Sequence, residues 1–193
     1  GSGNNQSKFD NYSLDFSGGK INLNNLVELG TKSTISFWFK STTGNAANLI
    51  LGSSAYQHGD FLMIESGADS LNVRLGNGTG ALKAFTGLTE INDGNWNHWV
   101  VTRNDDVVEL FINKTSKGSV TYTSTILDTK FDVIGAKSSG GSTILGQLQQ
   151  LSCFDYVLST SQISYLYNNN AVGSTPNPQN PMAISGNSPI AYY

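Results

Sequence analysis

The sequence predicts an all-β protein, an antiparallel two-sheet β-sandwich with one short C-terminal helix. Between Tyr12 and Asp155, short runs of alternating apolar and polar residues are separated by clusters of Gly, Asn, Asp and Ser, a pattern typical of antiparallel sheets. Only one stretch carries the start signals of a helix. A chain of 193 residues suits one sandwich domain with tails, and its 38% of hydrophobic residues is enough for a core without disulfides or metals.

The clearest core strand is expected at residues 34–40. There Ile35, Phe37 and Phe39 share one face, because neighbouring side chains of a strand point to opposite sides. The apolar face of this strand is therefore predicted to face the other sheet.

Hairpins and the remaining strands follow from turn signals. Residues 97–103 and 107–112 flank the turn Asn104-Asp105-Asp106, whose residues tolerate tight backbone geometry. The glycine-rich stretch 76–80 predicts another hairpin turn. Further strands are expected near Leu14, Leu49, Leu62, Val73, Phe85, Val120, Val133 and Leu148.

The single helix is predicted to begin after Ser159. A hydroxyl at Ser159 and an amide at Gln162 have the spacing of a capping box, in which each side chain bonds a backbone N–H of the first turn. Ile163, Leu166 and Tyr167 then follow at helical spacing and predict a face that packs on the sandwich.

Composition predicts the domain boundaries. Residues 1–11 are expected to be an expression remnant and a disordered lead, and residues 12–170 the folded domain. All four prolines lie within residues 176–193. Residues 171–193 are therefore expected to be a Pro- and Asn-rich linker followed by the start of a further, truncated domain.

The charge content excludes several partners. Only 13% of residues are charged and the net charge is −3, so no basic surface exists that could follow a phosphate backbone. No apolar stretch approaches the roughly 20 residues that span a bilayer, so membrane insertion is not expected. Cys153 is the only cysteine, which rules out an intrachain disulfide and predicts a small core residue.

The order of these elements resembles a known family. Four stretches carry the likeness: Tyr12–Gly18, Thr34–Lys40, Asp93–Asn113 with its Trp-Asn-His-Trp run, and Gly146–Tyr167. They are similar to the laminin-G-like and pentraxin-like jelly rolls of the concanavalin A-like lectin/glucanase superfamily. The resemblance implies a jelly-roll sandwich whose rim loops carry any ligand site.

The resemblance to pentraxins also bears on calcium. It implies a calcium site between the loop after residues 133–135 and the loop at residues 56–60. Here the first loop contains Lys137, and Asp60 is the only acid of the second. Because calcium takes six to eight oxygen ligands including carboxylates, we expect no cofactor; if calcium binds, Asp60 is the candidate ligand.

A ligand site is predicted in the same loop. Tyr56, His58 and Asp60 would supply a stacking ring, a hydrogen-bond donor and an acceptor. The alternative is an ordinary solvated loop.

The other aromatic side chains that could bind a ligand are predicted to have structural roles instead. Trp38, Trp96 and Trp99 stand in alternating strands, which favours core and sheet-edge packing over sugar stacking. His98 is expected to be half-buried and bonded to a neighbouring carbonyl.

No catalytic residues are predicted. Glucanases of this superfamily carry their acids as Glu-x-Asp-x-x-Glu on one strand, whereas Glu28, Glu65, Glu90 and Glu109 are isolated from that pattern. A glycosidase needs two facing carboxylates. The sequence also contains no zinc-protease, P-loop or nucleophile-elbow motif, so we predict a protein that is not an enzyme.

The predicted function is a non-catalytic recognition or attachment module that binds a glycan or another surface polymer. It would belong to a larger extracellular or phage virion protein, because the Asn-Pro-rich segment before Ser188–Tyr193 resembles structural proteins of marine phages. The alternative is a capsid or tail decoration domain that contacts other virion or surface proteins. A glycoside hydrolase ranks third.

Overall fold

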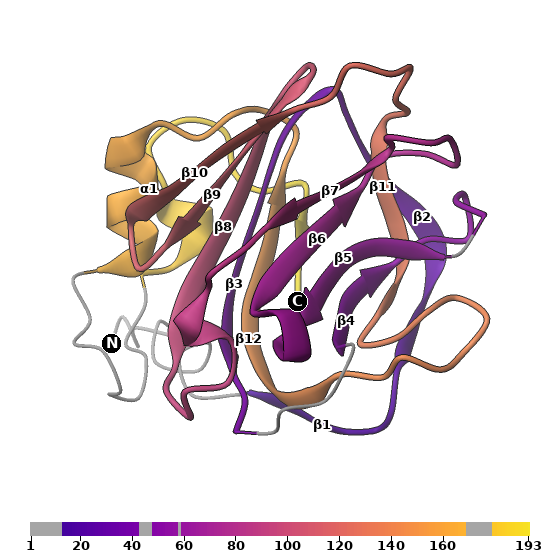
Figure 1. Cartoon of the computed structure of the whole chain (residues 1–193). Coiled ribbons are helices and arrows are strands. Elements are labelled where there is room, and N and C mark those ends of the chain that lie inside the picture. The colour runs from indigo at the N-terminus through magenta and orange to yellow at the C-terminus, as the bar shows by residue number, and fades with distance from the viewer. Residues whose placement is uncertain (1–12, 43–47, 58, 169–178) are drawn as a thin grey trace.

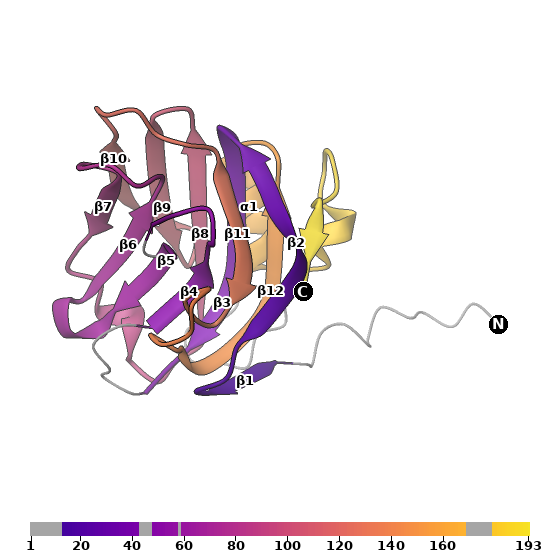
Figure 2. The same ribbon diagram turned by 90° about the vertical axis from the view of Figure 1, so that its right-hand side faces the viewer.

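The computed structural model describes residues 13–42, 48–57, 59–168 and 179–193. Two antiparallel sheets lie face to face in these residues (Figures 1 and 2). This architecture confirms the predicted jelly-roll sandwich with one short helix.

The first sheet runs in the order β1-β12-β3-β8-β9-β10, and β13 also pairs with β12. Its strands are β1 (Leu14–Ser17), β12 (Leu145–Phe154), β3 (Lys32–Lys40), β8 (Asn97–Asn104), β9 (Val107–Ile112), β10 (Thr115–Thr121) and β13 (Ala191–Tyr192).

The second sheet runs in the order β2-β11-β4-β5-β6-β7. Its strands are β2 (Ile21–Gly30), β11 (Thr129–Ile134), β4 (Asn48–Gly52), β5 (Asp60–Glu65), β6 (Ser70–Arg74) and β7 (Leu82–Phe85). Three short 3-10 turns, η2 (Ser66–Ala68), η3 (Thr89–Ile91) and η4 (Pro181–Ala183), complete the described elements together with α1 (Thr160–Tyr167).

The core lies between the sheets and is rich in aromatic rings. Phe37 and Trp99 of the first sheet are stacked with ring centroids 6.5 Å apart. Phe61 and Phe131 of the second sheet are stacked at 6.4 Å. All four side chains are completely or almost completely buried, and such rings contribute strongly to core energetics. Cys153 is also fully buried, as predicted, and burial raises the pKa of its thiol.

The helix α1 covers the outer face of the first sheet (Figure 2). Its apolar residues Ile163 and Leu166 pack with Val100, Phe111 and Phe154 of the strands beneath. The predicted capping box is present: the Ser159 hydroxyl accepts a bond from the Gln162 N–H at 3.3 Å, and the Gln162 side chain accepts one from the Ser159 N–H at 2.8 Å. This arrangement satisfies two otherwise unpaired donors of the first turn.

The predicted hairpins are also confirmed. In the β8–β9 hairpin, Asp105 adopts a left-handed backbone conformation with a φ of 54°. The glycine-rich stretch 76–80 joins β6 and β7, which pair in register from Leu71 with Phe85 to Arg74 with Leu82. The β2 strand is an addition that the alternation pattern does not indicate, whereas residues 189–193 resemble the start of a strand in the sequence and form β13 on β12 of this same domain.

The C-terminal residues differ from the prediction. The composition predicts that residues 171–193 are a linker and the start of a separate domain, but the described part of this segment, residues 179–193, packs back onto this domain. Ile184 is buried against the α1 cluster, and the Ile190 N–H donates to the Cys153 carbonyl at 2.8 Å. The Tyr193 N–H donates to the Leu151 carbonyl at 2.8 Å, and the Leu151 N–H donates back to the Tyr193 carbonyl at 2.9 Å. These bonds complete an otherwise open part of the β12 edge, which the composition of the segment could not reveal.

Two glycines bring the rim loops close together. Gly135 has a φ of 88°, and a Cβ added there would lie 2.6 Å from the Phe16 ring. A Cβ on Gly52 would lie 2.3 Å from the Ala136 carbonyl oxygen. Only glycine permits both the left-handed conformation and this backbone approach, so the sequence places the loop after β11 directly against β4. Among the described helices, none is long and apolar enough to cross a membrane.

Candidate functional site

The predicted ligand residue Tyr56 is a core residue instead. A tight turn, closed by the Ser53 N–H on the Gly59 carbonyl at 2.9 Å, directs its ring inward. The side chain is 3% exposed, the ring centroid lies 6.1 Å from that of Phe61, and the hydroxyl donates to the Asp128 carbonyl at 2.7 Å. Burial raises its pKa to about 12. The prediction of a ligand-facing ring was therefore wrong, because the loop turns this side chain into the sandwich.

Asp60 is held by two cations of the protein. Its carboxylate lies 3.6 Å from the Lys137 ammonium and 3.7 Å from the Arg74 guanidinium, and its side chain is 14% exposed. The two loops that the pentraxin resemblance connects do meet in space, but through this ion pair. Two positive charges beside one carboxylate do not suit Ca²⁺, which needs several oxygen ligands. Within the described residues, no group of three His, Cys, Asp or Glu side chains could hold a metal.

The third predicted ligand residue, His58, lies outside the described residues. The predicted trio is therefore not brought together in the part of the chain that the structure places, because one member is in the core and another is in an ion-pair cluster.

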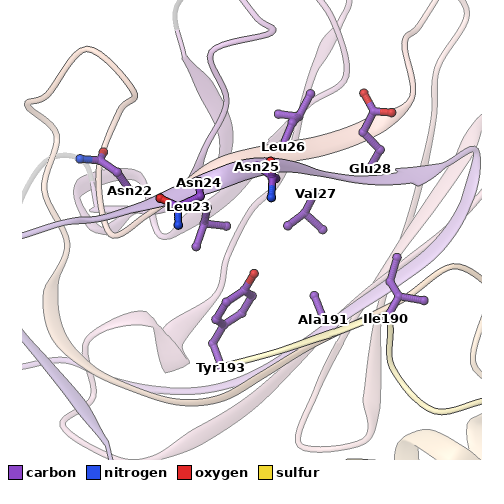
Figure 3. A pocket seen from close by; sticks show the side chains of 10 residues that line it. All are labelled: Asn22, Leu23, Asn24, Asn25, Leu26, Val27, Glu28, Ile190, Ala191 and Tyr193. Carbon is purple, nitrogen blue, oxygen red and sulfur yellow. The ribbon is translucent and has the colours of Figure 1, made fainter.

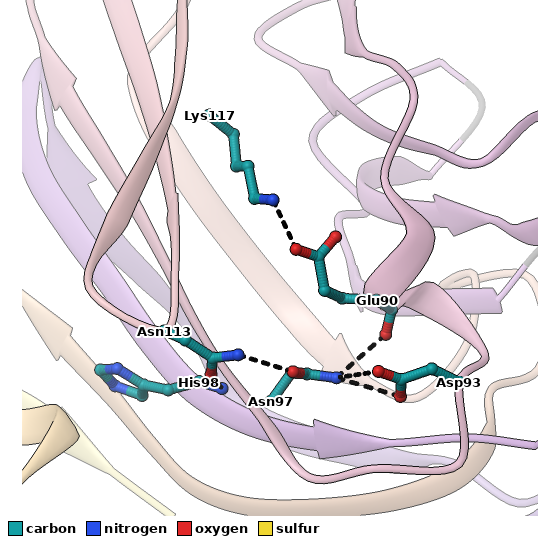
Figure 4. A network of polar contacts seen from close by, with 6 residues as sticks. All are labelled: Glu90, Asp93, Asn97, His98, Asn113 and Lys117. Atoms are coloured by element: carbon teal, nitrogen blue, oxygen red, sulfur yellow. Dashed lines mark hydrogen bonds and ion pairs between the residues drawn. The ribbon is translucent and has the colours of Figure 1, made fainter. Parts of the chain in front are cut away.

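A second polar cluster lies at the start of β8 (Figure 4). The buried Asn97 side-chain amide donates to the Glu90 carbonyl and to an Asp93 carboxylate oxygen, each at 3.2 Å, and its oxygen accepts from the Asn113 amide at 2.7 Å. The Lys117 ammonium pairs with the Glu90 carboxylate. These bonds tie the η3 loop to the β9–β10 turn, so the cluster is a structural brace.

His98 and the tryptophans extend this brace beneath α1. The His98 Nε2 lies 2.8 Å from the Ser36 hydroxyl, and the side chain is 1% exposed. It is thus fully buried and bonded to a hydroxyl, in contrast to the predicted half-buried residue bonded to a carbonyl. Trp38 stacks on Tyr167 with ring centroids 5.7 Å apart. Trp38, Trp96 and Trp99 are all buried, which confirms their predicted packing role.

The four glutamates lie on four different elements with four different partners. Glu28 lies 3.8 Å from Lys130, and Glu65 accepts from Asn72 at 3.0 Å. Glu109 accepts from the Ser116 hydroxyl at 2.6 Å, while Glu90 pairs with Lys117. No described contact joins two of these carboxylates, and each is bonded or paired to a different side chain.

A concave surface lies as a groove between β2 and β13 (Figure 3). Its volume is about 530 Å³, within the range of ligand sites of this kind. One wall comes from each sheet, and the two strands lie side by side at one edge of the sandwich (Figure 2). Ten residues line it: Asn22, Leu23, Asn24, Asn25, Leu26, Val27, Glu28, Ile190, Ala191 and Tyr193. We call this surface the edge groove.

A wide bulge shapes the β2 wall. Between two paired positions, β2 advances from Asn22 to Val27 while β11 advances only from Val133 to Phe131. The extra residues arch away from the sheet, as in other bulges. A regular strand would alternate its side chains, whereas here the consecutive residues Asn24 and Asn25 are both exposed. The bulge thus presents two adjacent amides at the groove.

The opposite wall supplies apolar surface. Tyr193 is 44% exposed and Ile190 is 51% exposed, and the Tyr193 ring points from β13 across the edge groove toward Leu23 and Asn24 (Figure 3). Amides that donate and accept hydrogen bonds therefore face an aromatic ring across an open channel. This arrangement can bind hydroxyl-rich molecules, but it holds no pair of acids and no nucleophile activated by a base.

Comparison with known proteins identifies the family. A family model for the Concanavalin A-like lectin/glucanases superfamily matches residues 15–164. The chain belongs to this superfamily. The resemblance found in the sequence is thereby confirmed. No curated protein sequence matches the chain.

Solved structures show the same fold at low sequence identity. A heptameric SAP-like pentraxin from Limulus polyphemus has a TM-score of 0.63 and 18% identity, covering 94% of this chain and 93% of that one. A Bacteroides ovatus protein whose suggested role is carbohydrate binding has a TM-score of 0.64 and 14% identity, over 93% of this chain and 50% of that one. The botulinum neurotoxin serotype D binding domain has a TM-score of 0.59 and 22% identity, over 81% of this chain and 42% of that one. The chain therefore spans half or less of the length of the Bacteroides ovatus protein and of the botulinum neurotoxin binding domain.

Proposed function

We propose that this lectin-like domain is a non-catalytic recognition module that binds a glycan in the edge groove. One observation carries the proposal: adjacent asparagine amides on the β2 bulge face the exposed Tyr193 ring across a groove of about 530 Å³. Amides bond sugar hydroxyls, and an aromatic face packs on the apolar face of a sugar ring.

The relatives support a binding role. The superfamily includes lectins, and the similar structures include a protein associated with carbohydrate binding and a toxin binding domain. The separately partnered glutamates support binding without cleavage. We place the domain on an extracellular or virion surface, where such a module would attach its parent protein to a glycan-bearing partner.

A glycan array followed by affinity measurements tests this proposal. We expect the double variant Asn24→Ala/Asn25→Ala and the variant Tyr193→Ala each to weaken binding roughly fivefold or more, since each removes contacts worth about 1 kcal/mol. Asn187→Ala, an exposed asparagine away from the edge groove, is the matched control. A His58→Ala variant tests the loop of the originally predicted site in the same assay.

The alternative function is a structural decoration domain that makes only protein contacts. It would use exposed apolar side chains such as Met182 and Ile190, each 51% exposed. If the wild-type protein binds no glycan on a broad array but does bind virion or surface proteins, this alternative is favoured over glycan binding.

A further inference from the structure

On the basis of the proposed glycan-binding function, we infer that the ligand of the edge groove is an uncharged polysaccharide segment that lies along β2. Three features of the groove lead to this ligand class: its charge, the chemistry of its polar groups and its length.

The charge of the lining excludes acidic sugars. Among the ten lining residues, Glu28 is the only charged side chain and none is cationic. The Glu28 side chain is 63% exposed and lies 3.8 Å from Lys130, so its charge is only partly balanced. Recognition of a carboxylate, sulfate or sialic acid normally relies on arginine or lysine. An anionic chain in this groove would meet a carboxylate and no positive partner among the lining residues.

The polar groups match hydroxyls instead. The amides of Asn22, Asn24 and Asn25 can each donate two hydrogen bonds and accept others, and a sugar hydroxyl can do both. Because Asn24 and Asn25 are adjacent and both exposed, they can bond neighbouring hydroxyls of one sugar ring. The Tyr193 ring on the facing wall supplies a surface for the apolar face of that ring (Figure 3).

The length of the wall favours a chain over a single sugar. Asn22 and Glu28 stand at opposite ends of the β2 wall (Figure 3). They are separated by six steps along the strand, which at about 3.3 Å per residue gives at most about 20 Å. Several sugar rings in a row can therefore contact the wall, and the affinity should rise with the length of the oligosaccharide until the groove is filled.

Calorimetric titration with defined oligosaccharides tests the inference. The probes are neutral gluco-, xylo- and mannohexaoses with their disaccharides, and anionic oligogalacturonate and sialyllactose. We expect binding of at least one neutral hexaose, weaker binding of its disaccharide and no binding of the anionic probes. The affinity should be insensitive to salt between 50 and 500 mM, because screening acts only on charged ligands.

Variants test where the oligosaccharide binds and whether the groove accepts a charged ligand. Asn24→Ala/Asn25→Ala and Tyr193→Ala should each weaken neutral binding roughly fivefold or more, whereas Tyr193→Phe should keep most of it because the ring remains. Glu28→Lys should admit the anionic probe, because it replaces the negative charge of the groove lining with a positive one. Circular dichroism of each variant confirms that the fold is intact.

The outcomes separate the two hypotheses. Salt-sensitive binding of only the anionic probes, lost in the Asn24→Ala/Asn25→Ala variant, would overturn the uncharged-ligand inference and keep the proposed function. Absence of binding to every glycan, or glycan binding that no groove variant weakens, would overturn the proposed function of this groove as well.

Discussion

His98 is buried among aromatic rings with no acid beside it. Its Nε2 bonds to the Ser36 hydroxyl, and its ring lies 5.0 Å from Trp38 and 6.2 Å from Tyr167 between centroids. Burial alone lowers its pKa from 6.5 to about 3, because the charged imidazolium would lose its hydration. The folded protein therefore keeps this residue neutral at every moderately acidic pH.

This burial predicts a specific loss of stability in acid. Above pH 6.5 both the folded and unfolded states hold a neutral His98, so no difference arises. As the pH falls from 6.5 toward 3, the unfolded chain takes up a proton that the folded chain refuses, and the free energy of unfolding decreases by up to about 1.4 kcal/mol per pH unit. Denaturant unfolding of the wild type and His98→Gln at several pH values measures this term. The same pH dependence of the free energy of unfolding in the two proteins would contradict this prediction.

Asp60 leads to a prediction about calcium. Because Lys137 and Arg74 already neutralise its carboxylate, we expect the melting temperature to be the same in millimolar calcium and in chelator. A ligand that binds only the native state must raise its stability. A rise of several degrees with calcium would show that Ca²⁺ binds and would overturn this interpretation of the rim.

At the scale of elements, the core strands were predictable because they alternate regularly. The apolar face of residues 34–40 and the hairpin of residues 97–112 follow directly from a period of two and from turn residues. The capping box fixed the start of α1 in the same way. In each case local chemistry and the tertiary fold favour the same structure.

The sequence did not reveal the edge groove, for a different physical reason in each of its two strands. In β2 the apolar residues Ile21, Leu23, Val27 and Leu29 all stand at alternating positions, but the polar pair Asn24-Asn25 interrupts the run, and the pairing with β11 is irregular there. This interrupted alternation is the signal that could have revealed the strand. For β13, the local pattern of residues 189–193 does indicate the start of a strand, but its pairing with β12 of the same domain depends on long-range contacts that no local pattern encodes.

The predicted rim site failed because residue type does not report side-chain direction in a loop. Tyr56 has suitable chemistry for a ligand, but the turn at Ser53–Gly59 directs it into the core. The ion pairs of Asp60 join residues far apart in sequence. Both facts depend on loop packing, which alternation and turn signals leave open.

β13 gives a prediction at this scale. Removal of residues 189–193 deletes one wall of the edge groove but only a two-residue strand of the first sheet. We expect a folded sandwich with unchanged far-ultraviolet circular dichroism and no measurable glycan binding. Retention of full affinity by this shortened protein would show that the ligand does not use the β13 wall.

At the scale of the whole molecule, the four glutamates are distributed over separate elements. Each glutamate lies on a separate element and is partnered there. We therefore expect purified protein incubated with β-glucans to release no reducing sugar above a blank. Release that persists through repeated purification would identify a hydrolase, and release that is lost in a Glu→Gln variant would name the responsible residue.

The edge groove has one wall in each sheet, so a molecule lodged there links the two layers at the edge where β13 is held to β12. The amides of Leu151 and Tyr193, which bond each other's carbonyls across that edge, become internal reporters of occupancy. Their hydrogens exchange with solvent only when residues 189–193 detach from β12. A ligand that contacts both sheets would slow this exchange without contacting either amide.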